Sequence, residues 1–103
     1  MNNRLTLRYS VVLPAVLVVE GRAITCEVGD VSLGGMFLRH AKIETGRRGV
    51  LRFACARLVG IALPFIVRWR DERGIGVQLE PNMLDETVLA TVIRASRRDP
   101  VPG

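Results

Sequence analysis

Two groups of side chains in the first third of the chain have the types and spacing of a ligand-binding site. Arg4 and Arg8 lie four residues apart, just ahead of the first apolar segment. Asp30 and Ser32 stand two residues apart, directly before a pair of glycines. Arginine presents a planar fork of donors that fits phosphate oxygens or the edge of guanine, whereas a carboxylate only accepts hydrogen bonds. These residue types favour binding of an anionic ligand that also carries hydrogen-bond donors.

The segment around Asp30 is predicted to be a tight turn between two strands, because short polar residues and glycines interrupt apolar runs there. If the preceding strand continues through Asp30 and Ser32, both side chains point to the same side. Gly35 is expected either to adopt a positive φ or to let a ligand come close to the backbone. The competing interpretation is that Asp30 and Ser32 only cap their own turn.

Together the two groups read Arg-x-x-x-Arg, followed about twenty residues later by Asp-x-Ser-x-x-Gly. In form, order and separation these motifs resemble the two signature motifs of the PilZ domain family, and the resemblance extends over about Arg4 to Pro81. PilZ domains are receptors for cyclic di-GMP. The resemblance therefore implies this ligand, and it implies an N-terminal arm that wraps the nucleotide. It also implies the residues that bind it, which are Arg4, Arg8, Asp30, Ser32 and Gly35.

The composition indicates one globular domain of 103 residues with a net charge of +5. All but one of its 15 cationic residues are arginine, which fits an anionic ligand. No apolar run reaches the roughly 18 residues of a membrane span, because Pro14 and Glu20 bound the longest one. The first residues also lack the pattern of a secretory signal. We therefore expect a cytoplasmic protein.

Neither catalysis nor metal binding is expected from the residue pattern. Cys26 and Cys55 form no close pair, and His40 is the sole histidine, so the usual metal-ligand spacings are missing. No pairing of a nucleophile with a base is evident. Both cysteines fall on the apolar phase of predicted strands and are expected to be buried, reduced thiols. The prediction is a binding protein with no cofactor other than the cyclic di-GMP ligand.

Alternating apolar residues predict six strands, at residues 9–20, 22–28, 35–39, 49–56 and 59–70 and around 75–79. Pro14 predicts an edge or a bulge in the first strand, and Pro64 predicts a bulge or bend midway along the fifth. Strict alternation in the fifth strand would point Val59 and Trp69 inward, which makes Trp69 a core residue. Short strands separated by turns favour a closed antiparallel barrel, because closure removes exposed edges.

After residue 81 the apolar period changes from that of a strand to that of a helix. Asn82, with Asp85 three residues on, is predicted to cap the helix. The apolar stripe is expected to pack on the barrel, against the outer valines of the first strand, and it consists of Leu84, Val88, Leu89, Val92 and Ile93. The predicted organisation is a flexible arm at residues 1–8, a barrel with a C-terminal helix at 9–98 and a disordered tail at 99–103.

Three functions are compatible with this pattern. The first is a stand-alone receptor that binds cyclic di-GMP and signals to an unidentified effector protein by ordering its arm. The second is a PilZ-like docking module, related to motility or pili, that binds no nucleotide. The third, a barrel that binds single-stranded nucleic acid, is disfavoured because such barrels expose aromatic platforms and this chain has few aromatics. A monomer or a homodimer would fit, and further ligand contacts stay open for Arg22, Arg39, Arg47 and Arg48.

Overall fold

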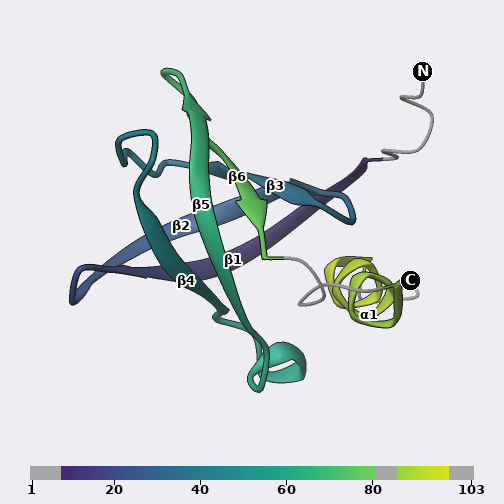
Figure 1. The fold of residues 1–103 in the computed structure, drawn as a ribbon. Coiled ribbons are helices and arrows are strands. Elements are labelled where there is room, and N and C mark those ends of the chain that lie inside the picture. Colours follow the sequence, from purple (N-terminus) through teal and green to yellow (C-terminus); the bar gives the residue numbers. More distant parts are fainter. Residues whose placement is uncertain (1–7, 81–85, 98–103) are drawn as a thin grey trace.

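The computed structural model describes residues 8–80 and 86–97, which form a β-barrel and one α-helix (Figure 1). In chain order the elements are β1 (Tyr9–Val19), β2 (Arg22–Val31), β3 (Gly35–Arg39), β4 (Arg48–Phe53), the 3-10 helix η2 (Ala56–Leu58), β5 (Ala62–Arg70), β6 (Gly74–Leu79) and α1 (Glu86–Arg97). The predicted fold, mainly β with six antiparallel strands and a C-terminal helix, is confirmed.

The six strands close into a barrel in the order β1-β2-β3-β6-β5-β4, and β4 pairs back with β1. All neighbours are antiparallel, so every strand has a partner on both sides and no edge is left open. Inward positions alternate with outward ones along each strand. The interior is filled by aliphatic side chains with no exposed area, among them Leu17, Leu38, Leu51 and Ile75.

The first hairpin follows directly from the sequence. Val19 pairs with Arg22 across a two-residue turn. Glu20 and Gly21 both have positive φ, at 51° and 79°. Two consecutive residues of this kind match the twist of the strands that they join, which is why short hairpins use them.

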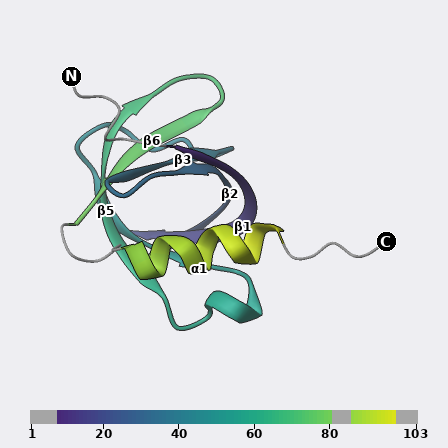
Figure 2. The same cartoon turned by 90° about the vertical axis from the view of Figure 1, so that its right-hand side faces the viewer.

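Helix α1 packs against β1 and η2 and buries Leu89, Val92 and Ala95 (Figure 2). Near its C-terminal end the Ser96 hydroxyl accepts a hydrogen bond of 3.1 Å from the Val12 backbone N–H. The expectation that the helix covers the outer valines of the first strand is wrong, because Val12 and Val18 remain 63% and 40% exposed. The predicted cap at Asn82 and Asp85, and Leu84 of the stripe, lie outside the described residues.

The fifth strand differs from its predicted form. It begins at Ala62, and Val59, which strict alternation placed inside, follows η2 and is 70% exposed. Pro64 pairs regularly with Val50, so the predicted irregularity there is wrong. The register instead shifts between Val67 and Trp69. An extra residue in one strand of a pair reverses the phase beyond it, and Trp69 is consequently 41% exposed and lies outside the core.

Two smaller expectations concern β1 and the cysteines. Pro14 pairs regularly with Glu27, and the irregularity of β1 lies before it, between Ser10 and Leu13. Cys26 and Cys55 are unpaired, as expected, but only partly buried at the margin of the core. Burial raises the pKa of the Cys26 thiol to about 12, so this side chain is protonated at neutral pH.

Candidate functional site

The Asp30 motif spans the end of β2 and the turn that follows it. β2 continues to Val31, beyond its predicted end, and its pairing with β3 shifts between Val28 and Asp30. Gly29 is therefore an extra, bulged residue. Val31 is fully buried, whereas Asp30 and Ser32 on either side of it are partly exposed. The two polar residues thus share the outer side of the barrel, although β2 ends at Val31, before Ser32.

The N-terminal arginine motif reaches the same place through Arg8. Its Nη1 atom donates a hydrogen bond of 3.1 Å to the Oδ1 atom of Asp30. The side chains are 58% and 28% exposed, so this is a surface ion pair that a ligand can reach. The contact follows from the hairpin, in which Tyr9 pairs with Val31 and Ser10 with Asp30. Arg4 lies outside the described residues.

Ser32 and Gly35 close the turn between β2 and β3. The Ser32 backbone N–H and hydroxyl both donate to the Gly35 carbonyl, at 2.9 and 3.3 Å. Ser32 therefore caps its own turn, whereas Asp30 instead binds Arg8. Positive φ among the described glycines is confined to Gly21 and Gly46, which rules out the first of the two alternatives for Gly35. A Cβ at Gly35 would lie 2.7 Å from the Val77 carbonyl oxygen, which means that glycine is needed here for close packing of β3 against β6.

An aromatic pair that the sequence analysis did not assign to the site lies beside Asp30. Asp30 pairs across the sheet with Phe37, Phe37 with Gly76, and Gly76 with Trp69, which makes one row over four strands. The Phe37 and Trp69 rings are stacked, with centroids 5.6 Å apart and planes inclined by 14°. A Cβ at Gly76 would lie 2.2 Å from the indole, so the missing side chain lets Trp69 lie against the backbone.

Two further arginines surround Phe37. The Arg73 guanidinium lies 5.4 Å from the centre of the Phe37 ring. Arg39 lies against Gly29, where its guanidinium carbon would be 2.9 Å from a Cβ, and it donates to Glu27 at 3.3 Å. The outer face of the Asp30–Trp69 row, with Arg8, Arg39 and Arg73, is hereafter the Asp30 face. It combines one carboxylate, two stacked rings and three cations.

The remaining arginines that the sequence left open lie elsewhere. Arg47 bonds to Glu20 at the first hairpin turn, and Arg22 lies at the same turn. Arg48 lies 3.6 Å from Glu80. Arg39 is therefore the one of the four that the structure brings to the Asp30 face.

Arg73 is held in position by its own hairpin. The Asp71 carboxylate accepts hydrogen bonds from the Arg73 side chain at 2.9 Å and from the Arg73 backbone N–H at 2.8 Å. The side-chain hydrogen bond from Arg73, followed by the backbone one, lowers the pKa of Asp71, and the side-chain hydrogen bond to Asp71, followed by the charge of Asp71, raises the pKa of Arg73. Both groups keep opposite charges at neutral pH, and the pair directs the guanidinium toward Phe37.

The sequence contains a partial signal for the aromatic pair. Phe37 lies across the β2–β3 turn from Asp30, as Met36 does from Val31, so a hairpin centred on this turn would have paired Phe37 with Asp30. Trp69 could not be placed this way, because no glycine or proline marks the bulge between Val67 and Trp69.

Comparison with known proteins agrees with this fold. A family model described as "PilZ domain" matches residues 2–96. Among solved structures, the Bacillus subtilis inhibitor of motility (MotI/DgrA) has a TM-score of 0.61 and 20% sequence identity, over 95% of this chain. The chain spans about half of that structure, 52% of its length, and the likeness is one of fold. No match was found among curated proteins. No described helix is long and apolar enough to cross a membrane.

Proposed function

The chain belongs to the PilZ domain family, and from this premise we propose that it is a receptor that binds cyclic di-GMP on the Asp30 face. The single observation that carries the proposal is the contact between Arg8 and Asp30, 3.1 Å long, in which the two signature motifs meet on the barrel surface. Of the proposed ligand contacts, Arg8, Asp30, Ser32 and Gly35 are described, and Arg4 is assigned from the motif alone.

Each group of the Asp30 face suits a part of the nucleotide. A carboxylate at Asp30 accepts hydrogen bonds from N1 and N2 of guanine, and a guanidinium can bind a phosphate or the O6 and N7 atoms. Trp69, 41% exposed and stacked on the buried Phe37, offers an apolar surface for a guanine base, and base stacking on an aromatic side chain contributes about 1–3 kcal/mol. The face can therefore bind both the base and the phosphate of one guanylate unit.

The ion pair between Arg8 and Asp30 does not prevent binding. An exposed pair contributes about 0–1 kcal/mol, whereas a hydrogen bond to a charged group contributes about 1.5–3 kcal/mol. Guanine at Asp30 and phosphate at Arg8 would replace one weak contact with two stronger ones. Ligand binding is thus favoured over the ion pair.

We propose that the signal is ordering of the N-terminal arm. Ordering a fully free arm of several residues would cost on the order of 10 kcal/mol, which is comparable to the roughly 8 kcal/mol of a micromolar complex. The arm is therefore either restrained in part before the ligand arrives or only partly ordered afterwards. The contact of Arg8 with Asp30 supplies such a restraint at the junction of the arm with β1.

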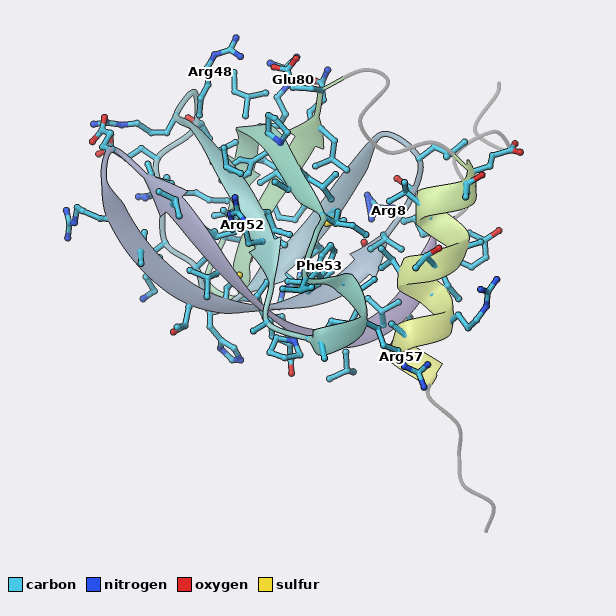
Figure 3. All side chains as sticks on the ribbon, turned by 90° about the horizontal axis from the view of Figure 1, so that it is seen from below. Arg8, Arg48, Arg52, Phe53, Arg57 and Glu80 are labelled. Atoms are coloured by element: carbon cyan, nitrogen blue, oxygen red, sulfur yellow. The ribbon has the colours of Figure 1, made fainter. Side chains whose placement is uncertain are left out.

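Calorimetric titration of cyclic di-GMP into four proteins tests the proposal. We expect saturable binding by the wild type and a loss of about tenfold or more in Arg8→Ala and in Asp30→Ala, since each removes a charged contact. Arg57→Ala is the matched control, because this exposed arginine on η2 lies far from Arg8 (Figure 3). A wild type that releases no heat at high micromolar ligand, or an Arg8→Ala protein that binds normally, would contradict the proposal.

The competing function is a docking module that binds no nucleotide. The solved inhibitor of motility shares the fold at 20% identity. A likeness of fold alone gives no reason to assign a motility partner to this chain or to reject one. The Asp30 face favours the receptor, because Arg8 and Asp30 of the two signature motifs meet there and the carboxylate can accept from guanine. In either case the proposed role is binding rather than catalysis, in the cytoplasm.

A further inference from the structure

A second outer face, on β1, β4 and β5, carries an apolar patch. Val18 pairs with Val50 and Val50 with Pro64, so these three side chains lie side by side across three strands. Val16 and Ile66 lie two residues along on the same outer phase and extend the patch. Val18 is 40% exposed and the other four are partly exposed, although each is apolar. These residues, with the charges described next, are called the Val18 face.

Arginines border the Val18 face. Arg52 pairs with Val16 and with Ala62, and Arg48 pairs with Ile66. Arg68 is the next outward residue of β5 after Ile66, and its Nε atom donates to the Gln78 side chain at 2.7 Å. Glu80 lies 3.6 Å from Arg48 (Figure 3), and beside Val18 the carboxylates of Glu20 and Glu44 both contact Arg47. Four arginines against three glutamates leave the face with a positive charge, which is concentrated at Arg52 and Arg68.

The same border contains a hollow of about 240 Å³ lined by Arg48, Ile66, Arg68, Gln78, Leu79 and Glu80. An aliphatic or aromatic side chain that enters it would meet Ile66 and Leu79 at the floor and charged groups at the rim. Apolar centres with arginine at their margins are typical of protein interfaces.

The described part of the chain does not cover this face. α1 packs on β1 and η2 but leaves Val18 exposed. The barrel is closed, so a partner cannot add a strand and has to bind through side chains. Exposed apolar residues grouped in this way mark a binding surface.

We propose that the Val18 face docks an acidic segment of a partner protein, which inserts apolar side chains between the arginines. Charge complementarity selects this occupant. A second copy of the chain, meeting this face with its own, would bring together two faces of the same positive charge, and like charges repel. The inference deepens the proposed function and rests on it, since the docked protein would be the effector of the receptor.

One strand belongs to both surfaces. β5 contributes Pro64, Ile66 and Arg68 to the Val18 face and Trp69 to the Asp30 face, on either side of its bulge. A nucleotide that moves Trp69 therefore acts on the strand that the partner contacts.

The test is a selection from a random peptide library. The library is first depleted on a variant with Arg48, Arg52 and Arg68 all changed to Gln, and it is then selected on the wild-type protein. The Asp30 face is intact in both proteins, so peptides that bind elsewhere are removed. Arg22, Arg57 and Arg94 changed to Gln form the matched control, because all six arginines are exposed and both variants lose three charges.

We expect the selected peptides to be acidic with aliphatic or aromatic anchors and to bind the first variant more than about tenfold more weakly than the control. When these peptides are added, the amide chemical shifts that change in the protein should belong to Val16, Val18, Val50 and Ile66. Recovery of no peptide, of peptides without net negative charge, or of peptides that map elsewhere would overturn the proposal. So would a homodimer, or binding to anionic lipid vesicles, that the first variant abolishes.

Cyclic di-GMP titration of the same proteins separates the two proposals. The Arg48, Arg52 and Arg68 variant should keep wild-type nucleotide affinity, and Arg8→Ala should lose it while still binding the selected peptides without nucleotide. If the wild type binds no cyclic di-GMP, the receptor proposal is rejected. The peptide selection still tests whether the Val18 face docks an acidic segment.

Discussion

Arg8 and Asp30, which are 22 residues apart in the chain, meet at 3.1 Å on the outside of the barrel. The hairpin of β1 and β2 brings them together, since Ser10 pairs with Asp30. The pair lies at one end of a cross-strand row whose other end is the exposed Trp69. A charged pair beside an aromatic stack is an arrangement that suits a guanine nucleotide, and the predictions below test that assignment and the packing beneath it.

Gly35→Ala is expected to destabilise the fold by about 1–3 kcal/mol, because its Cβ would lie 2.7 Å from the Val77 carbonyl oxygen. Gly34→Ala is the matched control, since no atom lies within 4 Å of a Cβ there. Both changes restrict the unfolded chain equally, which by itself stabilises by up to about 1 kcal/mol. The difference between the free energies of unfolding of the two variants, measured in urea, therefore gives the cost of the close contact at Gly35. Equal stabilities would show that Gly35 is not needed for contact between β3 and β6.

The pKa of the Asp71 carboxyl should lie below its ordinary value, chiefly because of the hydrogen bond from the Arg73 side chain. A lowered pKa means that this contact stabilises the hairpin above the ordinary carboxyl pKa and is lost as the pH falls through the lowered one. Carboxyl NMR titration measures it directly. Arg73→Gln should move the pKa of Asp71 back toward its ordinary value. An unchanged pKa in that variant would show that the backbone N–H groups of the turn cause the shift.

The fold could be predicted from the sequence because most of the strands alternate regularly and the turns are marked by glycine and polar residues. Trp69 was misplaced because alternation was carried through an unmarked bulge after Val67. Val59 was misplaced because the short helix η2 has no distinct apolar period. Phe37 was not recognised as a site residue, since its neighbour Trp69 reaches it through the fold of β5 and β6. The meeting of Arg8 with Asp30 was implied by the family motifs and not by spacing alone.

Amide exchange in residues 2–9 should slow when cyclic di-GMP is added, since the proposal assigns the signal to ordering of the arm. Exchange measured by mass spectrometry on N-terminal peptides checks this, with Arg8→Ala at the same ligand concentration as the control. If exchange in these residues stays unchanged while the wild type is saturated with ligand, ordering of the arm is not the signal. The proposal that the Asp30 face binds the nucleotide would then stand alone.

The most direct measurement is the fluorescence of Trp69, the sole tryptophan of the chain, during titration with cyclic di-GMP. A guanine base on the Asp30 face would lie against the Phe37–Trp69 stack, so we expect a saturable change in emission in the wild type and in Arg57→Ala. The midpoint should move by about tenfold or more in Arg8→Ala. Calorimetric binding without any change in Trp69 emission would place the nucleotide elsewhere on the barrel. The absence of both binding heat and a change in emission would contradict the receptor proposal itself.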